Sequence, residues 1–225
     1  MKPYFDQDGI TIWNSDCREV LPHVGRFGAV VTDPPFGIGF KYESHDDSPK
    51  GYAEFVWGVA EACEAVCLPG SPLFFWQSAT NIRLLHEWFP REWRLFPACK
   101  NFVQMRPTEM QWAWDPVLVW WTPGERYALG TDSRDYDVGD TNPSSREDAR
   151  GHPCPRPLST VLRIVQQWCR PTEAVIDPFL GSGTTLVACK KLGIRGVGIE
   201  KEEKYAEIAV KRILNTTPSL FSEER

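Results

Sequence analysis

The sequence has no apolar run long enough to cross a membrane, and its first ten residues, "MKPYFDQDGI", lack the apolar core of a signal peptide. Histidine is scarce too: the chain has four, and none stands at the spacing of paired metal ligands. We therefore expect a soluble, cytoplasmic protein that has no membrane partner and no metal site.

Cysteine pairs are also missing. The seven cysteines are odd in number and scattered along the chain, and no two of them form a C-x-x-C pair. This pattern disfavours both a disulfide scaffold and a structural zinc site. We expect reduced thiols that are mostly buried, because a free cysteine packs as a small apolar side chain.

Positive charge is not in excess. The chain carries 25 Lys and Arg against 30 Asp and Glu, a net charge of −5. A protein that coats nucleic acid through many phosphate contacts usually has a basic surface. The charge therefore argues against a passive nucleic-acid coat, but it leaves room for an enzyme with a confined basic cleft.

Apolar strands alternate with amphipathic helices along the chain. "GAVVTDPPF", apolar on both faces, is typical of the middle of a parallel sheet, and "AVIDPF" and "GVGIE" repeat this pattern between helix-like segments. "WRLFPACKNFV" and "DPVLVWWTPG" look like an antiparallel pair. We predict an α/β fold of three layers around a mostly parallel central sheet with an antiparallel strand. The length of 225 residues fits one domain, with the polar residues 123–157 as a long loop or partly ordered insertion.

The segment "VIDPFLGSGTT" carries the strongest signal of a ligand site. A strand ends at Asp177, a Gly-x-Gly turn follows, and a helix opens at Thr184. Gly181 and Gly183 let the backbone approach a ligand that lies at the carboxyl end of the strand. No lysine follows these glycines, and Leu186 stands where a dinucleotide fingerprint has its third glycine. The turn is therefore predicted to hold a ligand without a pyrophosphate.

The next strand, "GVGIE", ends at Glu200. A carboxylate in this place can accept hydrogen bonds from both hydroxyls of a ribose. A ligand with a ribose and no pyrophosphate fits S-adenosylmethionine, which consists of adenosine, a sulfonium and an amino-acid tail.

A second acidic strand end occurs in "DPPFGIGF", which follows the apolar run "GAVV". A purely structural explanation exists, because prolines end strands and glycines supply turn dihedrals. Only the rest of the chain decides between this explanation and a catalytic role.

Taken together, the motifs resemble those of amino-group DNA methyltransferases. "DPFLGSGTT" resembles the cofactor motif of that family, and "DPPF" resembles its catalytic Asp-Pro-Pro-Tyr motif; the order in the chain is that of the circularly permuted beta group. "NSD", ending at Asp16, resembles the segment that meets the adenine of the cofactor, and "GHPCPRPLSTVLRIV" resembles the His-Pro-x-x-Lys-Pro-Leu segment. The resemblance spans nearly the whole chain and implies a Rossmann-like methyltransferase fold with S-adenosylmethionine as cofactor.

The resemblance also implies how the reaction proceeds. A methyl group passes directly from the sulfonium to an exocyclic amine of a base that has swung out of the duplex. Asp33 and the backbone carbonyl of Pro34 would accept the amino hydrogens, and Phe36 would stack on the base. Pro34 and Pro35 suit this task because proline has a fixed φ and no competing N–H. The residues implied to bind the cofactor are Asp16, Asp33, His152, Asp177, Pro178, Phe179, Gly181, Ser182, Gly183, Thr184, Thr185 and Glu200.

Several of these residues have simpler explanations, and two positions depart from the family pattern. Asp16 and Asp177 are each in a place where a carboxylate commonly caps a helix or closes a turn, and His152 would serve equally as a loop residue. Phe36 replaces the usual tyrosine but keeps a stacking face. Arg156 replaces the usual lysine of the His-Pro-x-x-Lys-Pro-Leu segment.

The sequence favours adenine N6 as the target, because in this family an initial aspartate goes mostly with adenine and an initial serine mostly with cytosine N4. Cytosine N4 stays open, since one pocket can hold either amine. The same chemistry on RNA or on a protein amide, and an inactive DNA-binding regulator, are further alternatives. A carbon-5 cytosine methyltransferase with Cys154 as nucleophile is disfavoured, because that thiol precedes the cofactor motif.

Double-stranded DNA is the expected partner, and only residues between about 101 and 150 are free to recognise it. Basic residues flank the presumed cleft, among them Lys41, Lys50, Lys100, Arg106 and Arg126. Lys41, Lys50, Arg106 and Gln111 are the predicted DNA contacts. So compact a recognition region favours a homodimer that reads a two-fold symmetric site.

Overall fold

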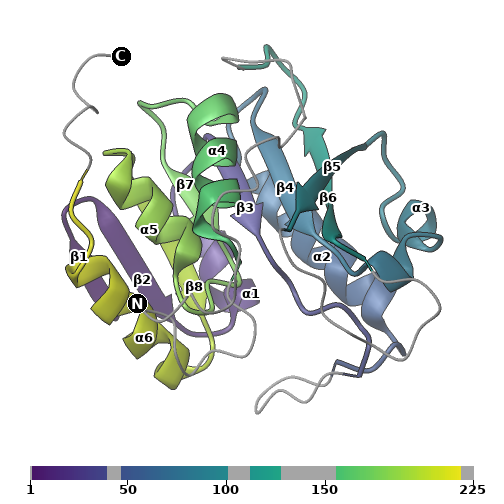
Figure 1. Cartoon of the computed structure of the whole chain (residues 1–225), viewed down its shortest axis with the longest axis horizontal. Coiled ribbons are helices and arrows are strands. Elements are labelled where there is room, and N and C mark those ends of the chain that lie inside the picture. The colour runs from purple at the N-terminus through teal and green to yellow at the C-terminus, as the bar shows by residue number, and fades with distance from the viewer. Residues whose placement is uncertain (1, 40–46, 101–111, 128–155, 219–225) are drawn as a thin grey trace.

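The computed structural model describes residues 2–39, 47–100, 112–127 and 156–218, and within these ranges one eight-stranded sheet lies between two layers of helices (Figure 1). The strands lie side by side in the order β1-β2-β8-β7-β3-β4-β6-β5. Their bounds are β1 Phe5–Gln7, β2 Ile10–Asn14, β3 Ala29–Thr32, β4 Pro72–Trp76, β5 Arg94–Cys99, β6 Trp114–Trp121, β7 Val175–Asp177 and β8 Gly196–Glu200. The predicted three-layer α/β fold is confirmed.

Five neighbouring strands, β2, β8, β7, β3 and β4, run parallel to one another. β6 pairs antiparallel with both β4 and β5, which confirms the predicted antiparallel pair. At the other edge of the sheet, β1 pairs antiparallel with β2. No sequence pattern indicates β1, because a strand of three residues is too short to display a hydrophobic period.

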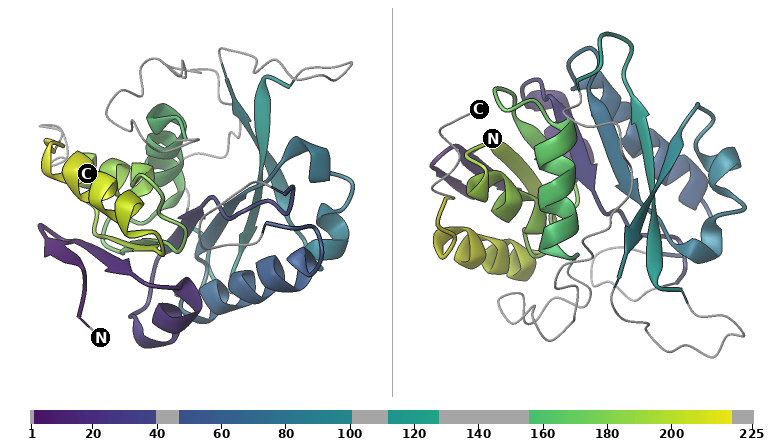
Figure 2. Two further views of the ribbon diagram at one scale, coloured as in Figure 1. Left: turned by 90° about the horizontal axis from the view of Figure 1, so that it is seen from below. Right: turned by 45° about the horizontal axis from the view of Figure 1, so that its top comes forward.

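Each central strand supplies apolar side chains to both faces of the sheet. In β4, Phe74 and Trp76 join the core on one face, while Leu73 and Phe75 join the core on the other. The first face is covered by α4 (Leu158–Trp168), α5 (Thr184–Lys191) and α6 (Glu203–Leu214), and the second by α1 (Cys17–Val20), α2 (Tyr52–Ala65) and α3 (Leu85–Trp88). The two views of Figure 2 show α2 and α4 on opposite sides of the sheet. Burial on both faces explains the uninterrupted apolar runs of the sequence.

Two predicted elements differ in extent from those observed. The strand expected to end at Asp16 ends at Asn14, and Asp16 caps α1 instead. The segment "NIRLLHEWF", expected as one helix, forms the 3₁₀ turn Ala79–Asn81 and the single-turn helix Leu85–Trp88. A tertiary contact accompanies this break, because the Asn81 side chain donates a hydrogen bond to the carbonyl of Phe36, 2.7 Å away.

The strand register brings the conspicuous acidic residues to one edge of the sheet. Val30 of β3 pairs with Ile176 of β7, and Asp177 of β7 pairs with Gly198 of β8. Parallel strands end at a common edge, so the chain leaves β3, β7 and β8 at neighbouring points. This carboxyl edge is where open α/β sheets bind ligands.

Candidate active site

Two segments that are far apart in the sequence meet at this edge. The hydroxyl of Thr32, at the end of β3, donates a hydrogen bond to Asp177 Oδ1 across 2.7 Å. The hydroxyl of Thr185, in the first turn of α5, lies 3.4 Å from the carbonyl oxygen of Val31 and donates to it. The tips of β3 and β7 are therefore fastened to each other by side chains, so that the residues after β3 adjoin the glycine turn after β7.

The glycine turn after β7 has a backbone that only glycine adopts readily. Gly181 has a φ of 52° and Gly183 a φ of 85°, both in the left-handed region. A Cβ atom at Gly183 would lie 2.8 Å from the Cβ of Ala209 in α6, so the helix and the turn pack in direct contact. The same helix holds the turn through Arg212, a buried residue whose guanidinium donates to the carbonyl of Ser182 at 2.7 Å and to the hydroxyl of Thr184 at 3.1 Å.

Sequence reasoning missed Arg212. Its one signal is a basic residue on the apolar face of the last helix, beside Ala209 and Ile213. A buried arginine must have its N–H groups satisfied, and here the glycine turn supplies the acceptors.

Glu200 joins the end of β8 to the same turn. Its Oε2 accepts the backbone N–H of Gly181 at 2.7 Å, and its Oε1 accepts that of Glu202 at 2.8 Å. Burial raises the pKa of this carboxyl, and backbone hydrogen bonds from Glu202, Gly181 and Lys201 oppose that rise. An ionised carboxylate has about four acceptor positions, so Glu200 keeps acceptor capacity for a ligand hydroxyl. The geometry is compatible with the ribose contact predicted for Glu200.

Asp177 is buried, and it closes a turn without capping a helix. Its Oδ1 accepts the backbone N–H of Phe179 at 3.1 Å, whereas the N-cap of α5 is Gly183. Burial raises the pKa of Asp177 to about 7, against the lowering effect of hydrogen bonds from Thr185 and Thr32. A carboxyl in this state can ionise in response to a cationic group nearby, such as an ammonium.

Asp16 acts as a cap in this structure. It is the N-cap of α1, and its carboxylate accepts hydrogen bonds from the backbone and the guanidinium of Arg18. These contacts with Arg18 hold the pKa of Asp16 well below its usual range. Arg18 in turn lies 5.9 Å from the ring centre of Phe55, and Phe55 packs edge-on against Phe179.

The tetrad Asp33 to Phe36 is held by hydrogen bonds from both sides. The hydroxyl of Tyr52 donates to the carbonyl of Pro35 at 2.7 Å, and Asn81 donates to the carbonyl of Phe36. Just beyond, the carboxylate of Asp47 accepts the backbone N–H of Gly37 at 2.6 Å. Among the described parts of the chain, no donor reaches the carbonyl of Pro34. This is the carbonyl that the resemblance assigns to the reaction. Tyr52, Asn81 and Asp47 were not identified from the sequence, since they lie on separate elements and form no motif.

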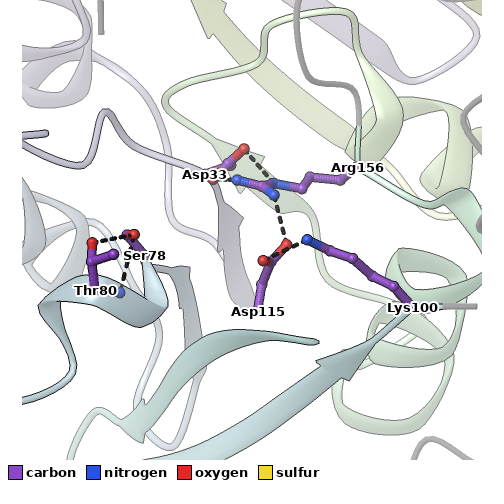
Figure 3. A network of polar contacts seen from close by, with 6 residues as sticks. All are labelled: Asp33, Ser78, Thr80, Lys100, Asp115 and Arg156. Atoms are coloured by element: carbon purple, nitrogen blue, oxygen red, sulfur yellow. Dashed lines mark hydrogen bonds and ion pairs between the residues drawn. The ribbon is translucent and has the colours of Figure 1, made fainter. Parts of the chain in front are cut away.

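Arg156 grips Asp33 with two parallel hydrogen bonds. Its Nε donates to Asp33 Oδ2 at 2.5 Å and its Nη2 to Asp33 Oδ1 at 2.7 Å, while its Nη1 donates to Asp115 Oδ2 at 2.9 Å (Figure 3). The guanidinium carbon also lies 5.3 Å from the centre of the Phe36 ring. Burial raises the pKa of Asp33, and the Arg156 charge and hydrogen bonds counteract that rise. The residue that departs from the family's lysine is therefore in direct contact with the tetrad Asp33 to Phe36.

Four predicted contacts, Lys41, Arg106, Gln111 and His152, lie outside the described residues, as does Cys154. Lys50, the remaining predicted DNA contact, is exposed just before α2. Within the described ranges, no three His, Cys, Asp or Glu side chains are grouped so as to hold a metal ion. No helix in those ranges is long and apolar enough to span a bilayer.

Comparison with known proteins adds three findings. A family model described as DNA methylase, of the N6/N4 type, matches residues 91–211. The Type II methyltransferase M.ScaI of Streptomyces caespitosus is 26% identical over 267 residues, which cover 98% of this chain and 86% of that protein. Two solved structures share the fold. The M1.HpyAVI–SAM complex has a TM-score of 0.67 at 22% sequence identity, and the match covers 90% of this chain and 99% of that one. The cytosine-N4-specific PvuII DNA methyltransferase has a TM-score of 0.68 at 15% identity, and the match covers 99% of this chain and 98% of that one.

Proposed function

Because the chain belongs to the N6/N4 DNA methylase family, we propose that it transfers a methyl group from S-adenosylmethionine to the N6 amine of adenine in double-stranded DNA. The observation that carries this proposal is the junction of β3 and β7, where the tetrad of Asp33 meets the glycine turn of Gly181 and Gly183. One solved relative, M1.HpyAVI, is in complex with SAM, which supports the choice of cofactor.

The residues at the edge of the sheet suit this cofactor. The glycines of the turn at Gly181 to Thr185 would let the protein backbone approach the cofactor closely. Glu200 would accept hydrogen bonds from the ribose hydroxyls of the cofactor, and Asp177 would face its ammonium group. Pro178 and Phe179 follow β7 and Asp16 follows β2, so these residues would stand beside the cofactor at the same edge of the sheet. When bound, the cofactor supplies an electrophilic methyl group on a sulfonium.

Asp33 and Pro34 would act on the amine of the target base. The lone pair of an exocyclic amine is delocalised into the ring, so the nitrogen is a poor nucleophile until it pyramidalises. The Asp33 carboxylate and the carbonyl of Pro34 would accept the two amino hydrogens and favour that geometry. The N–C bond forms as the C–S bond breaks, and one amino hydrogen leaves as a proton toward Asp33. No covalent intermediate with the enzyme is required.

Phe36→Ala should reduce methyl transfer at subsaturating DNA by about 5- to 150-fold, which corresponds to the loss of about 1–3 kcal/mol of base stacking. The Phe36 ring is partly buried, with the Arg156 guanidinium near it, so it is held in place to clamp a flipped base. Steady-state kinetics on a short duplex would measure the change. Phe36→Tyr keeps the ring and should stay close to wild type; full activity of the alanine variant would contradict the stacking role.

Adenine is proposed over cytosine because the tetrad begins with aspartate, which in the resembled family goes mostly with adenine N6. Cytosine N4 is the second candidate, and a specific observation favours it: the PvuII enzyme, which shares the fold over 99% of this chain, is cytosine-N4-specific. Methylation of unmethylated duplex DNA with radiolabelled S-adenosylmethionine, followed by digestion to nucleosides, separates the two. Label in N6-methyladenine supports the proposal and label in N4-methylcytosine replaces it. Unlabelled DNA, with label incorporated in parallel incubations with RNA or protein, refutes DNA as the substrate.

Recognition of the DNA sequence is proposed to rest on two segments, 101–111 and 128–150, within one catalytic domain of residues 1–225. Between them lies β6 (Trp114–Trp121), whose Val117 and Leu118 are buried in the core and cannot face DNA. Lys41, Lys50, Arg106 and Gln111 are the proposed contacts. A homodimer would place two copies of this recognition surface on a DNA site with two-fold symmetry. The similarity to M.ScaI, a Type II methyltransferase, supports a role in restriction-modification.

A further inference from the structure

We propose that Lys100 is a positioning residue for Asp33, acting through Asp115 and Arg156, and is not a contact to the DNA backbone. This inference rests on the function proposed above. It runs against the sequence-based expectation, in which Lys100 is one of several basic residues flanking a DNA cleft.

The first step is the placement of the Lys100 side chain. Lys100 follows β5, and its backbone N–H donates to the carbonyl of Ala113 at 2.8 Å, so it continues the antiparallel pairing of β5 with β6. Asp115 stands opposite Ala98 in the same ladder. Lys100 and Asp115 are thus diagonal neighbours on one face of the sheet, which is the arrangement in which long side chains meet.

The second step is the continuity of the charges. Lys100 Nζ lies 2.6 Å from Asp115 Oδ1, and Asp115 Oδ2 accepts from Arg156, which holds both oxygens of Asp33 (Figure 3). Positive and negative groups alternate along this row of four, and their charges sum to zero. The side chains of Lys100, Asp115, Arg156 and Asp33 are 18%, 19%, 12% and 25% exposed, so water screens their interactions only in part. The Asp115 carboxylate neutralises the Lys100 charge, which weakens the attraction of Lys100 for a DNA phosphate.

The third step is the effect on Asp33. Burial raises the pKa of this carboxyl, the charges of Arg156 and Lys100 lower it, and that of Asp115 raises it. From β7, Asp177 is a further acidic group close enough to interact with Asp33. If Lys100 is removed, the two carboxylates of Asp115 and Asp33 share the single positive charge of Arg156. One negative charge is then left uncompensated. Asp33 would then keep its proton up to a higher pH, and a protonated Asp33 accepts amino hydrogens poorly.

The test is the pH dependence of single-turnover methyl transfer in wild type and Lys100→Met. In a plot of transfer rate against pH, we expect the acidic limb of the Lys100→Met curve to lie about one pH unit higher than that of wild type. On this limb the rate of transfer is then about tenfold lower than that of wild type, and it recovers toward alkaline pH. The DNA dissociation constant and its salt dependence should stay within about twofold of wild type. Lys100→Arg should restore the wild-type limb, and Lys211→Met, which removes an exposed charge on α6, should leave the limb in place.

Two results would overturn the proposal. In the first, the transfer rate of Lys100→Met has the same pH dependence as wild type, while its affinity for DNA is lower and the slope of log affinity against log salt concentration is smaller by about one. This result would mean that Lys100 contacts a phosphate. If transfer falls equally at every pH, Lys100 is merely structural. Should Lys100→Met fail to fold, Lys100→Gln removes the same charge while its amide can still bond Asp115.

A second measurement does not depend on the proposed function. The carboxyl ¹³C signal of Asp33, assigned by its loss in Asp33→Asn, can be titrated in wild type and Lys100→Met. An upward shift of the titration midpoint in the variant supports the positioning role even if the wild-type protein methylates no DNA. An unmoved midpoint refutes that role whatever the protein methylates.

Discussion

Asp33→Asn is expected to lower single-turnover methyl transfer by about 10²- to 10⁴-fold, the range for a side chain that handles a proton in the transition state. The amide keeps the shape of the carboxyl but loses its charge and presents an N–H₂ group toward Arg156. That guanidinium then faces a poor acceptor instead of a carboxylate that takes two charge-assisted hydrogen bonds. Rapid-quench assays at saturating cofactor and DNA would measure the loss.

The same experiment distinguishes a chemical defect from a folding defect. Asp33→Ala should still bind S-adenosylmethionine at least in part, as calorimetry would show, while losing transfer. Asp8→Asn, at a surface position with a φ of 54° that asparagine tolerates, is the matched control and should behave as wild type. Retained transfer in Asp33→Ala would remove the proposed mechanism.

Gly183→Ala is expected to weaken cofactor binding by about 10- to 100-fold while leaving transfer recoverable at high cofactor concentration. The new Cβ would sit 2.8 Å from the Cβ of Ala209 and 3.1 Å from its Cα, so α6 or the turn must move. The left-handed φ of 85° adds about 1–3 kcal/mol of backbone strain. Each 1.4 kcal/mol by which this strain destabilises the turn conformation that binds the cofactor lowers the affinity for the cofactor about tenfold. The measurements are calorimetric titration with cofactor and transfer rate against cofactor concentration.

Gly9→Ala provides the control for backbone strain alone. Gly9 also has a left-handed φ, 76°, but it lies in the turn between β1 and β2, and its Cβ would meet chiefly the flexible side chain of Arg195, at 3.3 Å. We expect lower thermal stability with unchanged cofactor affinity. Equal affinity losses in both variants would mean that Gly183 matters for folding and not for the cofactor turn.

The motif residues could be predicted from the sequence because their constraints are local. Asp33, Asp177 and Glu200 each end an apolar run, and the turn at Gly181 to Gly183 is marked by glycine itself, the residue that a positive φ requires. Where an acidic residue and a turn-forming residue follow an apolar run, the acidic residue is expected at the end of a strand. This expectation does not depend on the position of the strand in the sheet. The helix α4 was likewise evident from its own period.

The partners of these residues could not be predicted in the same way. Arg156 reaches Asp33 across 123 positions of sequence, and Asp115 reaches Arg156 across 41. Lys100 could be noticed as a charge but not assigned, since whether it faces Asp115 or solvent depends on the pairing of β5 with β6. Tyr52 and Asn81, which hold the tetrad, come from two further elements.

Short stretches of residues were enough to define the alternation of strands and helices, the positions of the strand ends, and the chemical groups that stand at them. The folded sheet was needed to establish which strand ends are neighbours, that the carbonyls of Pro35 and Phe36 accept hydrogen bonds from Tyr52 and Asn81, and that Arg156 binds both oxygens of Asp33. The difference is one of range: hydrophobic period and turn dihedrals act over a few residues, whereas strand order, burial and ion pairing join groups that become neighbours only when the whole sheet has formed.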